Sequence, residues 1–338
     1  MNVKAKLFAW AAIGLMLVAS ISGCNQAAED TPPPLIVEDD GQAGKDPASG
    51  SGAEEITVAL VMKTLTNPFF IEMEKGAREA ESELGITLLV KTGAQETSIE
   101  QQITIIDNLI KEQVDAIVIA PADSTELIPV LKKAQDAGIV IINVDNRLDP
   151  DAAEQVGLTG VPYISVDNEQ GGYLSAGYIS DQLTAPTQVI ILEGIRTAGN
   201  AEDRKNGALR AFGENDNVEV VAMETAHWKI DEAYEVTAQL FGLHPDIGAI
   251  FCANDMMAFG VLRYLDETGQ ADVLVAAYDA LEDAKEAIRA GTLETTIDQQ
   301  AALQAYTGVQ YAVRALDGES LPSETLVDVM LVTQENVD

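Results

Sequence analysis

The fold follows from the segment at residues 56–70, which reads ITVALVMKTLTNPFF. Its first seven residues are almost all apolar, which is typical of a strand buried on both faces of a sheet. Asn67 and Pro68 then predict the start of a helix, because Asn is a favoured N-cap and Pro fits the first helical position. The segment therefore predicts a strand that leads directly into a helix, the repeating unit of a parallel sheet.

The same alternation continues along the chain. We expect strands at 56–62, 86–90, 116–120 and 139–144, with helices at 68–84, 98–113 and 124–137. A second series has strands at 189–192, 219–223, 249–252, 273–276 and 294–297, and helices at 169–183, 202–212, 231–241, 256–267 and 281–290. The expected fold class is α/β, with two doubly wound parallel-sheet lobes.

Composition limits the functions open to this chain of 338 residues. It is 47% hydrophobic and 22% charged, so it can bury a large core. The formal net charge of −35 would repel a phosphate backbone, so we expect no nucleic acid partner. A cytoplasmic sugar-responsive transcription regulator is excluded by the export signal described below and by the lack of a basic helix-turn-helix segment.

We also expect no metal and no cofactor. Two Cys and two His are too few for a zinc site built from these residues, and no EF-hand, P-loop or dinucleotide-binding motif occurs. Cys252 lies within an apolar run and is interpreted as a buried structural thiol. Asp145 and Asp279 could in principle act as a carboxylate pair on a glycoside, but the missing motifs argue against an enzyme.

The N-terminus has the pattern of an export signal. Lys4 and Lys6 precede an apolar run at 7–19, which is too short to span a bilayer. Ile-Ser-Gly-Cys at 21–24 resembles the lipobox of bacterial lipoproteins, so residues 1–23 are predicted to be a signal peptide and Cys24 the lipidated residue that anchors the protein at the cell envelope. An ordinary secretory signal and an uncleaved anchor are the alternatives. Residues 24–55 are predicted to be a flexible acidic tether.

Polar and aromatic side chains follow nearly every predicted strand. Ligands of open α/β sheets bind outside the carboxyl ends of the strands. Asn, Asp, Gln and Arg suit vicinal hydroxyl groups, and aromatic rings can cover the C–H faces of a sugar. Each residue also has a structural interpretation. Asn67 caps a helix in any case, and one of Phe69 and Phe70 is expected in the core. Of the next pair, we expect Asn254 to bind the ligand and Asp255 to serve as a cap or a hinge residue.

The segments 63–70 and 252–255 resemble the type I periplasmic binding proteins for ribose and D-allose, and the resemblance covers roughly residues 56–333. It implies two lobes joined by three crossing segments, near 165–168, 297–300 and 318–322, with the ligand in the cleft between them. The implied N-terminal lobe is 56–166 plus 300–319, and the C-terminal lobe is 167–299 plus 320–338. The ligand-binding residues implied are Lys63, Asn67, Phe69, Phe70, Asp145, Asn146, Asn200, Arg204, Trp228, Asn254, Asp279 and Gln299.

The resemblance also implies a function. The protein is expected to be a monomer that captures a monosaccharide, or a cyclic polyol such as inositol, by lobe closure and delivers it to the permease of an ABC importer. Phe69 or Phe70 would face Trp228 across the sugar ring. Lys63 fits the allose branch, whereas Asn146-Arg147 after Asp145 departs from both branches. A sensor that presents ligand to a chemoreceptor or histidine kinase is the alternative role.

Overall fold

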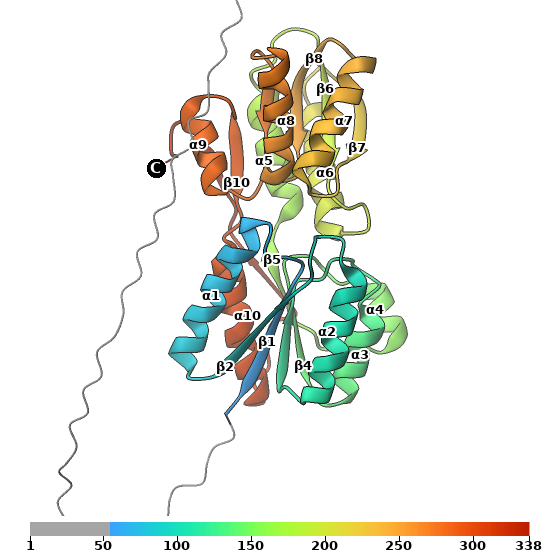
Figure 1. The fold of residues 1–338 in the computed structure, drawn as a ribbon, viewed down its shortest axis with the longest axis vertical. Coiled ribbons are helices and arrows are strands. Elements are labelled where there is room, and N and C mark those ends of the chain that lie inside the picture. The colour runs from blue at the N-terminus through green and yellow to red at the C-terminus, as the bar shows by residue number, and fades with distance from the viewer. Residues whose placement is uncertain (1–54, 338) are drawn as a thin grey trace, which may run out of the picture. The chain divides into compact units, whose positions relative to one another are not determined.

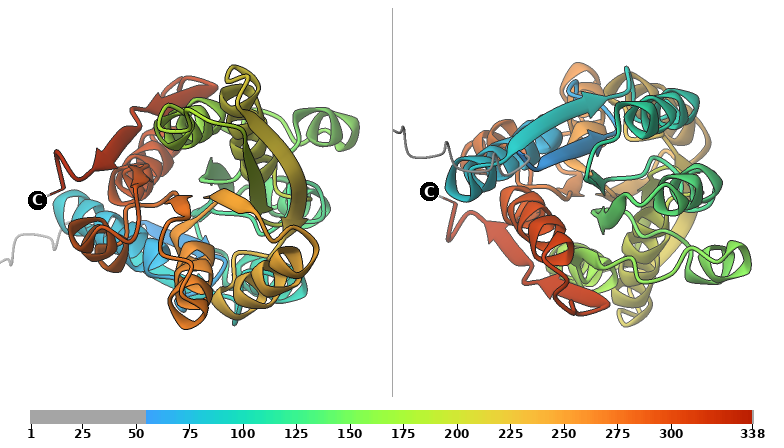
Figure 2. Two further views of the ribbon diagram at one scale, coloured as in Figure 1. Left: turned by 90° about the horizontal axis from the view of Figure 1, so that it is seen from above. Right: turned by 90° about the horizontal axis from the view of Figure 1, so that it is seen from below.

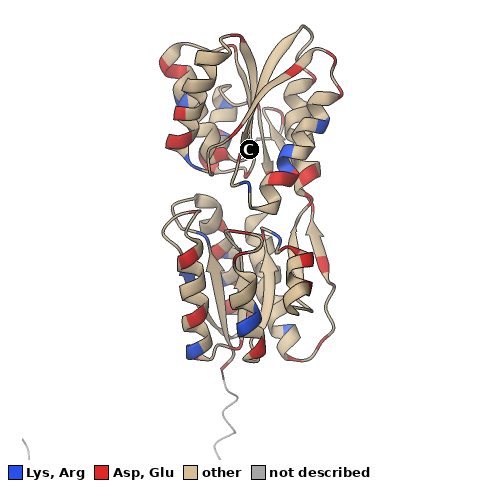
Figure 3. Ribbon diagram, turned by 90° about the vertical axis from the view of Figure 1, so that its right-hand side faces the viewer, with Lys and Arg blue, Asp and Glu red and all other residues tan. Residues whose placement is uncertain are grey.

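A computed structural model describes residues 55–337, which form two α/β lobes (Figure 1). The predicted signal peptide, Cys24 and nearly all of the predicted tether lie outside the described residues. Asp and Glu positions, marked red on the ribbon of Figure 3, occur in both lobes. Among the described residues, the acidic residues are therefore not confined to one lobe.

The first lobe contains a six-stranded parallel sheet in the order β11-β5-β4-β3-β1-β2. Its strands are β1 (Thr57–Met62), β2 (Thr87–Thr92), β3 (Ala116–Ile119), β4 (Val140–Val144), β5 (Tyr163–Val166) and β11 (Glu324–Val327). Its helices are α1 (Pro68–Leu84), α2 (Ile99–Glu112), α3 (Ile128–Asp136), α4 (Pro150–Val156) and α10 (Ala301–Leu316).

The second lobe repeats this plan with the order β12-β10-β9-β8-β6-β7. Its strands are β6 (Thr187–Glu193), β7 (Val218–Thr225), β8 (Ile247–Cys252), β9 (Leu274–Ala276), β10 (Thr295–Asp298) and β12 (Met330–Thr333), and β12 is antiparallel to β10. Its helices are α5 (Asn168–Ser180), α6 (Gly199–Gly213), α7 (Ile230–Leu243), α8 (Asp255–Thr268) and α9 (Glu282–Ala290). Seen from its two ends, the molecule has helices around each twisted sheet (Figure 2).

Burial on both faces of the sheets explains the apolar strands. In β1, Val58 and Leu60 pack in one core cluster, together with Met73 of α1. Ala59 and Val61 point the other way, into a cluster that contains Leu109 of α2 and Leu131 of α3. Because successive side chains of a strand point to opposite faces, a strand covered on both sides must be apolar at every position.

The chain passes between the lobes at three places: from β5 into α5, from β10 into α10, and from β11 into β12. The second and third passages are joined, since Nε2 of Gln300 donates a hydrogen bond to the carbonyl oxygen of Asp328, 2.6 Å away. These passages bring the carboxyl ends of the two sheets toward each other, so that their strand-end loops face one cleft.

The expected boundary near residues 318–322 is wrong. The sequence analysis places 320–338 in the second lobe, but β11 pairs in parallel with β5 of the first lobe, and the last passage lies between β11 and β12. Gly318 and Pro322 mark a turn within the first lobe instead. Thr325 of β11 is also tied to this lobe, because its hydroxyl lies 3.0 Å from that of Tyr311 in α10.

Candidate functional site

A narrow cavity lies between the strand ends of the two lobes. The centre of a water molecule can move through only about 20 Å³ of it, so its walls are close together. Side chains of both lobes line this cavity, and they are Lys63, Asn67, Phe69, Phe70, Glu96, Asp145, Asn200, Arg204, Trp228, Asn254, Asp279 and Gln299. The polar ones are almost completely shielded from solvent.

Asn67 is positioned by the helix that it starts. Its Oδ1 accepts a hydrogen bond from the backbone N–H of Phe69 at 3.0 Å, and Pro68 occupies the first position of α1, as the sequence predicts. This bond fixes the amide orientation, so Nδ2 points to Glu96 and donates a hydrogen bond to Oε1 at 2.9 Å. The same cap directs Phe69 and Phe70 to the cleft end of the helix.

Lys63 and Asp145 form a buried ion pair in the first lobe. Nζ of Lys63 lies 3.0 Å from Oδ2 of Asp145, and both side chains are almost inaccessible to solvent. Asp145 follows β4 and has a φ of 63°, in the left-handed region that few non-glycine residues adopt. Such backbone conformations persist where the surrounding structure enforces them, commonly at ligand sites.

Arg204 of α6 organises the wall of the second lobe. Its Nε donates to Oδ1 of Asn168 at 2.8 Å, Nη1 donates to the carbonyl oxygen of Ala253 at 2.9 Å, and Nη2 donates to Oε1 of Gln299 at 3.2 Å. Its guanidinium carbon lies 3.7 Å from the ring centre of Tyr278. These contacts hold a planar array of N–H groups in one orientation before any ligand arrives.

Asp279 completes this network. Its Oδ1 accepts a hydrogen bond from Nε2 of Gln299 at 2.6 Å and lies 3.6 Å from Nη1 of Arg204. Burial raises the pKa of Asp279 to about 7, although the guanidinium of Arg204 acts in the opposite direction. Asp279 also has a positive φ, 123°.

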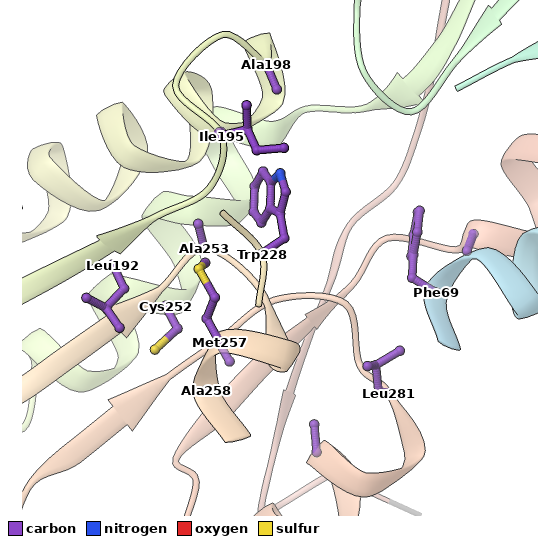
Figure 4. Packing of buried hydrophobic residues seen from close by; sticks show 14 of the residues in the cluster. Phe69, Leu192, Ile195, Ala198, Trp228, Cys252, Ala253, Met257, Ala258 and Leu281 are labelled. Atoms are coloured by element: carbon purple, nitrogen blue, oxygen red, sulfur yellow. The ribbon is translucent and has the colours of Figure 1, made fainter. Parts of the chain in front are cut away.

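Aromatic rings approach the cavity from both lobes. Figure 4 shows the ring of Phe69 and the indole of Trp228 on opposite sides of the space between the lobes. The indole packs on Gly194, where an added Cβ would lie 1.9 Å from Cζ2 of Trp228. Trp228 itself has a φ of 66°. Phe69 and Phe70 of the first lobe and Trp228 of the second line the same cavity, and the stacking of one Phe ring and Trp228 on a sugar stays a prediction.

Two buried polar atoms in the wall have no partner within residues 55–337. They are Oδ1 of Asn200 and Nε1 of Trp228, whereas Oδ2 of Asp145 has only its ion pair with Lys63. A buried polar atom without a partner costs about 1–3 kcal/mol, so such atoms are uncommon in folded proteins. One acceptor and one donor without partners, in a wall that also holds aromatic rings, are well suited to a compact polyhydroxylated ligand.

The structure brings all the predicted ligand residues into the cavity wall except Asn146. The Asn146 amide is engaged elsewhere: Nδ2 donates to the carbonyl oxygen of Pro121 at 3.2 Å, and Oδ1 accepts from the backbone N–H of Asn200 at 3.3 Å. Asn146 therefore lies outside the cavity wall and contributes to contact between the lobes, and its role as a ligand residue stays a prediction. Arg147 also points away and pairs with Glu324 at 3.3 Å.

The division of roles between Asn254 and Asp255 also needs correction. Asn254 lines the cavity but is itself the cap of α8, since Oδ1 accepts from the backbone N–H of Met257 at 2.9 Å. Asp255 is fully buried and fixes the loop after β9. Its carboxylate accepts hydrogen bonds from the hydroxyl of Thr296 at 2.7 Å and the backbone N–H of Leu281 at 2.8 Å.

Glu96 is the wall residue that the sequence analysis missed. It follows β2, at the same edge of the sheet as the predicted residues, and this position was the available signal. Burial raises its pKa, while nearby Lys63 acts in the opposite direction. The thiol of Cys252 is buried as expected, and burial also raises its pKa.

The part of the chain that the structure describes has neither a metal-binding cluster nor a membrane-spanning helix. No group of three or more His, Cys, Asp or Glu side chains within residues 55–337 is arranged to bind a metal ion. Over the same range, no helix combines the length and the apolar character needed to cross a membrane.

Comparison with known proteins places this site in a family. The periplasmic binding protein domain matches residues 58–320, so the chain belongs to the periplasmic binding protein family. The chain is 38% identical over 270 residues to the D-ribose/D-allose-binding protein of Pseudomonas aeruginosa, covering 79% of this chain and 84% of that protein. It is 32% identical over 286 residues to the D-allose-binding periplasmic protein of Escherichia coli, covering 82% and 91%.

A solved structure is similar over nearly the same range. It is an ABC transporter periplasmic solute binding protein from Actinobacillus succinogenes with bound D-allose. The two chains are 39% identical, the match covers 84% of this chain and 99% of the other, and the TM-score is 0.80. These findings confirm the fold class and the family resemblance predicted from the sequence.

Proposed function

We propose that the protein captures one monosaccharide in the cavity between its lobes and delivers it to an ABC sugar importer. The observation that carries this proposal is a cavity lined by buried polar groups and by Phe69 and Trp228, in which Oδ1 of Asn200 and Nε1 of Trp228 have no partner within residues 55–337. A sugar supplies hydroxyl groups around its edge and C–H groups on its faces. This division matches a wall with polar edges and aromatic faces.

The charges in the wall favour a neutral ligand. Lys63 is balanced by Asp145, and Arg204 lies beside Asp279, so neither cation is left over to neutralise an acidic group. The named relatives bind D-ribose or D-allose, and the similar solved structure contains D-allose. D-Allose and D-ribose are therefore the first ligands to test, with myo-inositol as the cyclic polyol.

The supporting experiment is a thermal unfolding screen of the mature protein against these three compounds and other aldoses and ketoses. A ligand at about 100 times its dissociation constant stabilises a protein by about 2.7 kcal/mol, which is a clear shift of the melting temperature. We expect at least one neutral monosaccharide to give this shift and to be recovered unchanged, as judged by nuclear magnetic resonance. Conversion of the sugar in proportion to protein and time would show an enzyme instead.

We further propose that lipid on Cys24 anchors the exported protein at the cell envelope. Support comes from the Ile-Ser-Gly-Cys sequence after the short apolar run. The net charge of −35 cannot attract an anionic membrane surface, so the anchor must be apolar. Replacing Cys24 with Ser should release the protein from the membrane fraction or leave an unprocessed precursor. A normally processed, membrane-bound Cys24→Ser protein would contradict this proposal.

A further inference from the structure

Glu96 has the geometry of a binding residue, although no sequence motif marks it. It sits in the loop after β2, is 6% exposed, and lines the cavity together with Asn67. Its Oε1 is occupied by the hydrogen bond from Nδ2 of Asn67. No hydrogen bond to its other oxygen, Oε2, occurs within residues 55–337. One carboxyl oxygen is thus anchored and the other is available.

The ion pairs of the wall leave Glu96 without a cation. Lys63 is 3.0 Å from Asp145, and Arg204 is 3.6 Å from Asp279. No ion pair of Glu96 occurs among the described residues. A carboxyl buried without a cation is destabilising unless it is hydrogen-bonded or protonated. Glu96 has one such hydrogen bond, from Asn67 to Oε1, and its Oε2 has none, so the carboxyl is only partly satisfied within the fold.

We propose that Glu96 contacts the ligand directly, with Oε2 of its carboxyl hydrogen-bonded to one hydroxyl group of the bound sugar. This inference rests on the proposed function and adds to it a recognition group in the first lobe. Asn67 sets the orientation of the carboxyl, because its own amide is fixed by the cap of α1. Glu96 thereby determines which hydroxyl pattern the site accepts.

The surrounding charges allow this contact in either protonation state. Lys63 after β1, Asp145 after β4 and Arg204 of α6 are the charged groups that act on Glu96. The raised pKa of Glu96 shows that burial outweighs the two cations. A protonated carboxyl donates to a hydroxyl oxygen, and an ionised one accepts from a hydroxyl O–H. The contact itself does not depend on which form is present.

The test compares a sugar with its deoxy derivatives. The tightest ligand of the wild-type protein among D-allose, D-ribose and myo-inositol is identified by calorimetry, and each of its monodeoxy derivatives is then titrated into wild type and Glu96→Ala. We expect Glu96→Ala to weaken binding of the parent compound about tenfold. We expect one monodeoxy derivative, which lacks the hydroxyl that Glu96 contacts, to bind both proteins equally.

Two further variants complete the design. Glu96→Met keeps roughly the length of the side chain but has neither a carboxyl oxygen nor an N–H or O–H donor, and it replaces Glu96→Ala if the latter fails to fold. Glu294→Ala is the matched control, since burial raises the pKa of Glu294 as well, but that residue lies at the start of β10, outside the cavity wall. The control should bind the parent compound like wild type.

These measurements distinguish a failure of the inference about Glu96 from a failure of the proposed function. If every monodeoxy derivative loses the same factor on substitution of Glu96 as the parent does, then Glu96 acts only through Asn67 or the fold, and the inference is overturned. If none of the three parent compounds binds the wild-type protein, the proposed function fails, and the inference fails with it.

Discussion

Asn200 of the second lobe donates a hydrogen bond to Asp145 of the first, with 3.3 Å between Nδ2 and Oδ1. The other oxygen of Asp145 lies beside Lys63 and has no hydrogen-bond partner within residues 55–337. One carboxylate in the cavity wall thus pairs with Lys63 of its own lobe and joins that lobe to the other. Ligand binding and lobe closure therefore depend on the same group.

The first prediction concerns this carboxylate. Asp145→Asn keeps the shape of the side chain but removes the charge that faces Lys63, and it replaces one acceptor oxygen with a donor. Hydrogen bonds to charged groups contribute about 1.5–3 kcal/mol, so we expect affinity for the sugar to fall by more than tenfold in calorimetry. The control is Asp149→Asn at the cap of α4, where Asn is an equally good cap. Equal affinities of the two variants would contradict the assignment.

The second prediction is a pH dependence of stability. The pKa of Asp279 is raised to about 7 in the folded protein, from an ordinary value of 3.8. The folded state therefore holds this proton more tightly than the unfolded state, so the contribution of Asp279 to the free energy of unfolding falls as pH rises from about 4 to about 7. Asp279→Asn removes this titration.

Urea denaturation of ligand-free wild type and Asp279→Asn measures the effect. The acidic surface is present in both proteins and cancels. The charge of Asp279 also raises the pKa of buried Asp255, so the comparison reports on this coupled pair. The stability of wild type relative to the variant should decrease across this pH range. A difference that stays constant over the range would show that Asp279 is not perturbed in this way.

The third prediction uses Trp228 as a probe. The sequence has two Trp, and Trp10 lies in the proposed signal peptide, so Trp228 should be the single indole of the mature protein. Sugar binding replaces water beside the indole with C–H groups, and its fluorescence should change saturably. The change should disappear in Trp228→Phe. This variant should still bind the sugar, because Phe retains part of the stacking surface, but its affinity should be lower than that of wild type.

Gly194→Ala tests the position of the same ring. The added Cβ would lie 1.9 Å from Cζ2 of Trp228, so the indole must move and affinity should fall. Gly242→Ala is the control, since a Cβ there meets nothing within 4 Å. Constant emission of wild type in the presence of a tightly bound sugar would place Trp228 outside the site.

The fourth prediction concerns contact between the lobes beside the cavity. Oγ of Ser124 accepts a hydrogen bond from the backbone N–H of Gly199 at 3.0 Å, and the backbone N–H of Ser124 donates to the carbonyl oxygen of Thr197 at 3.2 Å. Ser124→Ala removes the first bond, together with the long hydrogen bond of 3.5 Å from Oγ to Oδ1 of Asn146 in the same lobe, and keeps the second. Because the bond to Gly199 exists only when the lobes meet, we expect sugar affinity to fall by about 0.5–1.5 kcal/mol with little change in the stability of each lobe.

Calorimetry of Ser124→Ala and of the exposed control Ser320→Ala checks this. Unchanged affinity in Ser124→Ala would mean that the contact does not contribute to the bound state.

Much of the site could be predicted because strand ends are visible in sequence. Apolar runs locate the strands, and the polar residue after each run is then placed at one edge of a parallel sheet. Glu96 was not predicted as a site residue because Lys91 and Thr92 at the end of β2 are polar. The strand predicted at 86–90 therefore ends two residues before the observed strand. The loop beyond it was consequently not taken as a strand end.

Other features depend on contacts that sequence order does not contain. Asp145 and Asn146 are adjacent and both accept a hydrogen bond from Asn200, yet Asp145 pairs with Lys63 in the cavity wall whereas the Asn146 amide donates to Pro121 outside it. Strand β11 is short and half-exposed at the edge of its sheet, so it carries no clear apolar pattern. Its pairing with β5 is set by tertiary structure, which is why the last boundary between the lobes was misplaced.

The central claim is that the cavity between the lobes binds one neutral monosaccharide. The most direct measurement is a calorimetric titration of the mature wild-type protein with D-allose and with D-ribose. The account predicts saturable binding of one sugar per protein, with a dissociation constant in the micromolar range or below, for at least one of the two. Absence of binding for both sugars, or saturation with several molecules per protein, would contradict it.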